Sequence, residues 1–146
     1  MDCGLKDMNP SKDTLKEYQL RHTGCRSDIL QSFQNFDFAL SHGDLEERFG
    51  DRFDRVTIYR TLKTFVEKGI IHKVLDDEGG TKYALCRNSE CSHDNHHHDH
   101  VHFKCLQCGN TTCIETAHIP VFNLPEGYKR TEVNMLVQGT CPTCVA

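Results

Sequence analysis

Four cysteines in two equal spacings are the strongest chemical feature of the sequence. Cys105 and Cys108 form one C-x-x-C pair, and Cys141 and Cys144 form a second. A glycine follows the first pair and a proline lies within the second, so each pair can present two thiolates from one tight turn. Four thiolates complete the tetrahedral shell of zinc, which predicts a structural zinc site rather than a catalytic one.

Histidines crowd into the segment just before the first of these pairs. In the run HHHDHVHFKC, apolar residues alternate with histidines in the way typical of a strand. His98, His100 and His102 would then share one face, with Val101 and Phe103 on the other. One face of this strand is therefore expected to offer imidazole ligands to a metal.

Pairing across the following turn adds a cysteine to this set. If Cys105 faces Asn110, antiparallel geometry sets the rest of the register. The pairs that it predicts are His102 with Cys113 and His100 with Glu115. Cys113 alone could equally be a small core residue, but a thiolate beside an imidazole favours Zn²⁺ over Fe²⁺, which prefers more oxygen ligands.

Length and composition limit the class of protein. The chain has 146 residues, 37% hydrophobic and 26% charged, enough for one ordinary domain or two small ones. Its start lacks the layout of a secretory signal, and no apolar run approaches the roughly 20 residues that span a bilayer. We therefore expect a cytoplasmic protein with no membrane partner, whose nine cysteines stay reduced and serve metal binding.

The first half of the chain has the element order of a DNA-binding domain. Helical spacing of apolar residues and two β-prone runs around Glu-Gly-Gly predict helices followed by a hairpin. The expected elements are helices near residues 15–20, 29–36, 45–49 and 54–68 and a hairpin over 70–86. This order predicts an α+β fold that begins with a winged helix-turn-helix.

The composition changes abruptly at Cys86, where polar residues and histidine become frequent. We therefore place a domain boundary there, with a winged-helix DNA-binding domain over 1–85 and a small α/β metal-binding domain over 86–146. The second domain is expected to hold the His-rich hairpin, a proline-bounded connection with room for a helix, and another strand.

The fourth predicted helix combines an apolar stripe with positive charge. Val56, Tyr59, Leu62 and Val66 share a stripe that is expected to face the core. Segment 51–73 carries six basic and three acidic residues in a chain of net charge −4, which favours contact with nucleic acid. Tyr59 thus has two interpretations, as a core residue or as a DNA contact.

Three motifs in order, VTIYRTLKTFVEKGIIHKV, HHHDHVHFKCLQCG and CPTC, resemble the ferric uptake regulator superfamily. The resemblance implies a homodimeric winged-helix repressor, with a C-terminal dimerisation domain and with metal-controlled binding to double-stranded operator DNA. It also implies that Tyr59 contacts thymine methyl groups and that Arg60 contacts bases or phosphates in the major groove. The residues expected to position phosphates are Thr57, Thr61, Lys63, Arg52 and Arg55.

The identity of the regulatory metal depends on a second set of residues, outside the two cysteine pairs. In iron-sensing relatives a histidine precedes the third helix, and the matching position here is Ala39. The runs GIIHKV and KYALC are instead similar to the zinc uptake regulator branch, where the corresponding His and Cys bind zinc. We expect a regulatory Zn²⁺ held by Cys86, His102 and Cys113, with a fourth ligand from His72 or His100. The alternative is an iron- or peroxide-responsive regulator that uses Fe²⁺ or Mn²⁺.

The sequence also offers ligands for a third metal site and features of two other functions. The candidate ligands of a further site are His98, Asp99 and His118. A zinc hydrolase or deaminase needs an open coordination position and a nearby Glu, and the deaminase pattern H-x-E does not occur. A thiol redox protein would use a C-x-x-C pair catalytically. The closed four-cysteine pattern favours a regulator that is not an enzyme.

Overall fold

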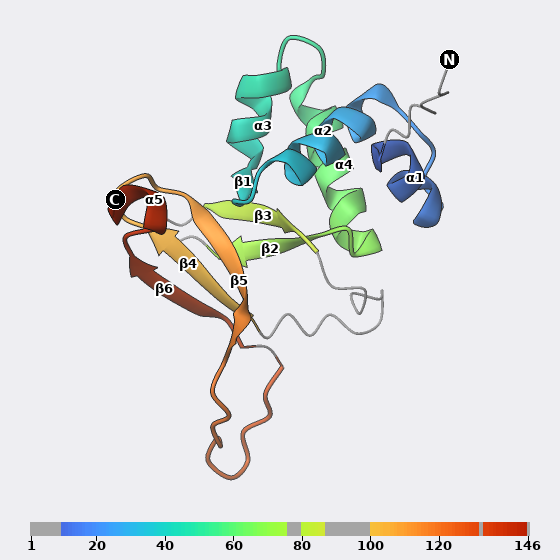
Figure 1. Cartoon of the computed structure of the whole chain (residues 1–146). Coiled ribbons are helices and arrows are strands. Elements are labelled where there is room, and N and C mark those ends of the chain that lie inside the picture. Colours follow the sequence, from blue (N-terminus) through green and yellow to red (C-terminus); the bar gives the residue numbers. More distant parts are fainter. Residues whose placement is uncertain (1–9, 76–79, 87–99, 132, 146) are drawn as a thin grey trace, which may run out of the picture.

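The computed structural model describes residues 10–75, 80–86, 100–131 and 133–145. Its elements fall into an N-terminal helical group with a small sheet and a C-terminal sheet (Figure 1). The first group contains α1 (Pro10–Glu17), α2 (Gly24–Asn35), β1 (Leu40–Ser41), α3 (His42–Phe49), α4 (Arg55–Lys68), β2 (Ile71–Leu75) and β3 (Thr81–Leu85). The second contains β4 (His100–Cys105), β5 (Thr111–His118), β6 (Met135–Gly139) and α5 (Pro142–Val145).

The helices form one core with the small sheet. Capping fixes their starts, because the Asp54 carboxylate accepts a hydrogen bond from the Thr57 N–H at 2.7 Å before α4. Gly69, with φ 76°, ends α4 in the left-handed conformation that glycine adopts readily. The largest fully buried side chains of this core are Leu15, Ile29, Leu30, Phe33, Leu45, Ile58, Leu62, Phe65, Ile70 and Ile71.

The buried face of α4 differs from the predicted stripe. Ile58, Leu62 and Phe65 face the core, whereas Val56 and Tyr59 are 54% and 56% exposed. Ile58, Leu62 and Phe65 follow the i, i+4, i+7 spacing of one helical face. Of the two interpretations of Tyr59, the core position is therefore wrong, because its side chain is exposed.

The wing is an antiparallel sheet of order β1-β3-β2. In its register His72 pairs with Ala84, and Cys86 extends the pairing through a hydrogen bond from its N–H to the Ile70 carbonyl at 2.9 Å. A domain boundary between 85 and 86 remains a prediction. Within the described ranges, no helix combines the length and apolarity needed to cross a bilayer.

The C-terminal sheet has the order β5-β4-β6, with β4 antiparallel to β5 and parallel to β6. The predicted pair of His102 with Cys113 is confirmed. His100 pairs with His118 rather than with Glu115, because a bulge shifts the register between His100 and Val101. The connection from β5 to β6 extends away from the sheet (Figure 1) and contains no helix in its described residues.

The wing and the C-terminal sheet meet directly. The Ala39 N–H donates to the Thr111 carbonyl at 2.6 Å, and Lys82 Nζ donates to the Gly109 carbonyl at 3.2 Å. Ala39, Val74 and Ala84 form a small buried cluster, against which Cys113 of the C-terminal sheet packs. This contact brings the predicted ligands of the two halves together.

Candidate metal centres and nucleic-acid interface

The four cysteines of the predicted structural zinc site converge on one point. We call Cys105, Cys108, Cys141 and Cys144 the four-cysteine knuckle. Cys105 is the last residue of β4 and Cys108 lies in the turn after it, while Cys141 precedes α5 and Cys144 lies within it. Their sulfur atoms all lie within 4.8 Å of one another. The parallel pairing of β6 with β4 explains this convergence, because both strands end at the same edge of the sheet.

Backbone hydrogen bonds prepare this cluster for a cation. The N–H groups of Cys108 and Cys141 point at Cys105 Sγ at 3.5 and 3.4 Å, and they lower the pKa of the Cys105 thiol to about 6. The hydrogen bond with the Cys141 side chain, together with burial and the other cysteines, raises the pKa of Cys144 to about 12. Crowded sulfur atoms that resist joint ionisation match the donor set of a tetrahedral zinc ion, which would offset their charge.

A second cluster joins the wing to the C-terminal sheet. His72 of β2 lies with its Nε2 3.4 Å from Cys113 Sγ on β5 and 3.5 Å from His102 Nε2 on β4. The ligand atoms of these three residues all lie within 4.8 Å of one another. His72 and His102 are 6% and 4% exposed, so their imidazoles are shielded from water. Two imidazoles and one thiolate from three strands are a suitable donor set for zinc.

Cys86 lies beside this cluster but on a different edge of the His72 ring. Its Sγ is 3.4 Å from His72 Nδ1, whereas Cys113 and His102 approach Nε2. Cys86 would therefore have to turn toward the Nε2 side to share an ion with the other three. Of His100, which begins β4, the structure describes only the backbone.

The predicted further site is largely outside the described residues. His98 and Asp99 are not described, and His118 is an exposed residue at the end of β5. His118 pairs with His100 through the bulge. This set remains a prediction.

The exposed side of α4 and the wing form a continuous surface. A groove of about 430 Å³ runs between them, lined by His42, Arg55, Val56, Tyr59, Thr81 and Tyr83. Thr57, Arg60 and Lys63 are also exposed on α4. Apolar and cationic groups thus lie side by side at the start of α4, which suits contacts to thymine methyl groups and phosphates.

Two of the residues expected to position phosphates are engaged elsewhere. Thr61 is only 6% exposed, and its hydroxyl donates to the Thr57 carbonyl at 2.9 Å and lies 3.5 Å from Cys25 Sγ. Arg52 pairs with Asp28 at 2.6 Å and lies over the rings of two phenylalanines. We therefore leave Thr61 out of the interface proposed below and assign Arg52 to the support of α2.

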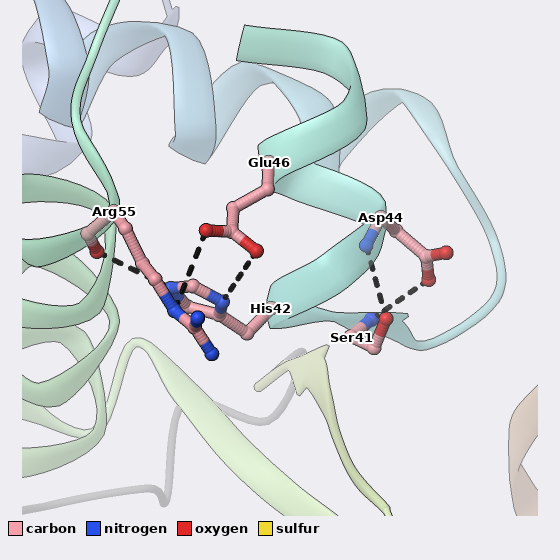
Figure 2. A network of polar contacts seen from close by, with 5 residues as sticks. All are labelled: Ser41, His42, Asp44, Glu46 and Arg55. Atoms are coloured by element: carbon pink, nitrogen blue, oxygen red, sulfur yellow. Dashed lines mark hydrogen bonds and ion pairs between the residues drawn. The ribbon is translucent and has the colours of Figure 1, made fainter. Parts of the chain in front are cut away.

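A network at the start of α4 was not anticipated from the sequence (Figure 2). The Glu46 carboxylate lies between two groups, with His42 Nδ1 and Arg55 Nε each 3.5 Å from one of its oxygens. His42 Nε2 lies 3.3 Å from the Arg55 carbonyl. The i, i+4 spacing of His42 and Glu46 was the available signal, but contact with Arg55 depends on how α3 packs against α4.

The winged helix, the exposed face of α4 and the buried cluster of potential metal ligands are the features of a metal-responsive DNA-binding protein. A family model described as "Ferric uptake regulator family" matches residues 17–135. The chain belongs to the ferric uptake regulator family, whose members are metal-responsive transcriptional regulators and not enzymes.

The relatives carry names that refer to different metals. The ferric uptake regulation protein of Synechococcus elongatus is 31% identical over 144 residues, which cover 91% of each chain. The zinc uptake regulation protein of Mycobacterium tuberculosis is 24% identical over 128 residues, which cover 85% of this chain and 92% of that protein. A solved structure described as "Zinc Uptake Regulator Complexed With Zinc AND DNA" has a TM-score of 0.63 at 22% identity and covers 93% of this chain and 91% of its own. This structural likeness concerns the fold.

Proposed function

We propose that this protein is a zinc-responsive repressor of metal-uptake genes, in which regulatory zinc joins the wing to the C-terminal sheet. The observation that carries the proposal is the cluster of His72 with His102 and Cys113. One ligand comes from the DNA-binding half and two from the other half, so an ion held by all three restricts the orientation of α4. Cys86, whose sulfur is within 3.4 Å of the His72 ring, is the proposed fourth ligand.

The donor set supports zinc as the regulatory metal. The three clustered residues supply two imidazoles and one thiolate and no carboxylate. Zinc takes such ligands in tetrahedral sites, whereas Fe²⁺ and Mn²⁺ favour more oxygen. The four-cysteine knuckle would hold a second zinc that stabilises the C-terminal sheet.

Operator DNA and a second copy of the chain are the proposed partners. Arg55, Tyr59 and Arg60 on the exposed start of α4 would contact DNA, with Thr57 and Lys63 beside them. Dimerisation follows from the family. The C-terminal half exposes apolar residues that a second copy of the chain would bury, including Phe122, Met135 and Val137. We also propose a cytoplasmic location, which the operator DNA partner supports.

In the proposed mechanism the metal acts on the orientation of the two halves and does not itself contact DNA. A dimer reads two half-sites, so both α4 helices must meet the major groove at one spacing. Zinc supplies a cation that attracts thiolate and imidazole ligands from both halves when it binds. His72, His102 and Cys113 would hold such an ion together only in the closed arrangement, so binding by all three would favour the DNA-binding pose.

The test compares metals in operator binding. A duplex would first be selected from a randomised pool by the zinc-loaded protein, and binding would then be titrated with Zn²⁺, Fe²⁺ and Mn²⁺ at buffered free concentrations. We expect binding to appear at low free Zn²⁺. Binding driven by Fe²⁺ or Mn²⁺ but not by Zn²⁺ would contradict the zinc proposal and favour the iron- or peroxide-responsive alternative. The similarity to the Synechococcus elongatus protein supports that alternative.

A further inference from the structure

A second contact between the two halves lies beside the four-cysteine knuckle. On β3 it involves Lys82, two residues before Ala84, which pairs with His72 of the regulatory cluster. We call it the wing–knuckle junction and define it by Ala39, Lys82, Gly109 and Thr111. Its two hydrogen bonds run from the Ala39 N–H to the Thr111 carbonyl and from Lys82 Nζ to the Gly109 carbonyl. Gly109 directly follows the first cysteine pair, so the junction rests on the turn that presents those thiolates.

The junction leads without interruption to the helix that faces DNA. Ala39 precedes β1, and Ser41 of β1 caps α3 through reciprocal hydrogen bonds with Asp44 (Figure 2). The next residue, His42, contacts the Arg55 carbonyl at the first residue of α4. A shift of the knuckle relative to the wing therefore reaches α4 through the backbone of residues 39–42 and the side-chain contact of His42 with the Arg55 carbonyl.

Two hydrogen bonds and one small apolar cluster hold this junction. Open grooves flank it on two sides, one of about 690 Å³ bordered by Phe38, Lys82 and Gly109, and one of about 360 Å³ bordered by Phe38 and Thr112. Thr111 is 1% exposed, and its hydroxyl has no partner among the described residues. The apolar contact beside these hydrogen bonds is small, a cluster of Ala39, Val74 and Ala84 with Cys113, so loss of either hydrogen bond should let the two halves move.

We infer that the four-cysteine knuckle is a second seat for the winged helix, and that Lys82 is a positioning residue for operator binding rather than a phosphate contact. The inference rests on the proposed function, because it concerns the same domain pose that regulatory zinc fixes. Zinc at the His72 cluster holds the wing at one point, and the knuckle holds it at another. Two separated points fix an orientation that a single point leaves free to rotate.

Lys82→Met tests this assignment, because methionine keeps the aliphatic length and removes the donor. The matched control is Lys73→Met, which removes the same charge from the exposed lysine on neighbouring β2. Both zinc-loaded variants would be measured on the duplex selected by the unmodified protein, across a series of salt concentrations. Loss of a phosphate contact lowers the magnitude of the salt slope by about 0.9 per contact, whereas loss of positioning leaves it unchanged.

We expect Lys82→Met to weaken DNA binding by at least about fivefold with an unchanged salt slope. Amide hydrogen exchange gives a readout that needs no DNA, and the Ala39 amide should exchange at least about tenfold faster in Lys82→Met than in Lys73→Met. Unchanged affinity, a reduced slope, or unchanged Ala39 protection would each overturn the inference. Failure of the unmodified protein to select any duplex would count against the proposed function instead, and the exchange experiment would still decide the junction.

A glycine pair provides a second, independent variant. Gly109 and Gly127 have φ of 78° and 91°, and at each an added Cβ meets nothing within 4 Å. Alanine therefore brings similar backbone strain at both sites, but only Gly109 lies in the junction. With bound zinc verified at the unmodified level, Gly109→Ala should weaken DNA binding at least about fivefold relative to Gly127→Ala. Equal affinity of the two variants would contradict the role of the knuckle.

Discussion

Individual ligands could be predicted where their geometry is local. The two cysteine pairs follow from spacing, and the pairing of His102 with Cys113 follows from strand register across a short turn. The edge of the His72 ring that Cys86 approaches could not be predicted, because it depends on how the wing packs against the C-terminal sheet. Sequence reasoning therefore named the cluster but not its internal arrangement.

Removal of Cys113 should abolish the regulatory site and spare the knuckle. We expect Cys113→Ala to lower affinity for one of two zinc ions by more than about 100-fold, since changes in groups that only support ligands already cost 10 to 100-fold. The matched control is Cys25→Ala, because Cys25 is a buried thiol whose pKa burial raises, lying against Thr61 and away from either cluster. Zinc titration against a chromophoric chelator measures both sites. Loss of both zinc ions in Cys113→Ala, or of neither, would refute the assignment.

The four-cysteine site should bind zinc less tightly as pH falls. Zinc binds thiolates, and Cys144, with a pKa raised to about 12 in the metal-free cluster, must release a proton at neutral pH. Cys105, with its pKa lowered to about 6, is already ionised at pH 7 but must also release a proton below pH 6. Log affinity plotted against pH should therefore steepen below about pH 6. A competition titration with a chelator of known pH dependence measures it, and a flat profile would contradict these ionisation states.

At the scale of elements, the order of helices and wing followed from local signals. Caps, apolar spacing and the Gly69 stop are short-range features, so the bounds of α4 were predicted closely. The orientation of α4 was not predicted. Val56 and Tyr59 offer one set of apolar groups and Ile58 and Leu62 another, and only contact with α2 and α3 selects the second set. The register shift between β4 and β5, whose extra residues 115–117 lie on β5, was not predicted either, because register past a turn is ordinarily continuous.

Ser41 gives an element-scale prediction, because it caps α3 next to the junction. Its hydroxyl accepts a hydrogen bond from the Asp44 N–H at 3.0 Å. The Asp44 carboxylate in turn accepts one from the Ser41 N–H at 2.9 Å. Ser41→Ala should lower the free energy of unfolding by about 1 kcal/mol, the usual cost of a lost cap. Urea denaturation of the zinc-loaded protein measures the difference. A change below about 0.3 kcal/mol would show that the cap contributes little here.

At the scale of the whole molecule, the two proposed metal sites have different relations to the two halves. The knuckle draws all four cysteines from the C-terminal half, so it can form without the winged helix. The second cluster takes His72 from the wing and its other members from the C-terminal sheet, so its formation depends on their relative placement. The sequence could indicate both donor sets, but their placement at separate points of the wing contact emerged only in three dimensions.

The most direct measurement of the central claim is a crystal structure of the zinc-loaded protein with anomalous scattering data at the zinc edge. The account predicts two zinc positions per chain. One should lie among the four knuckle cysteines, and the other should bond His72 from the wing together with His102 and Cys113, with Zn–N about 2.0–2.1 Å and Zn–S about 2.3 Å. Zinc at the knuckle alone, with His72 bonded to no metal in protein that binds its operator, would contradict the account.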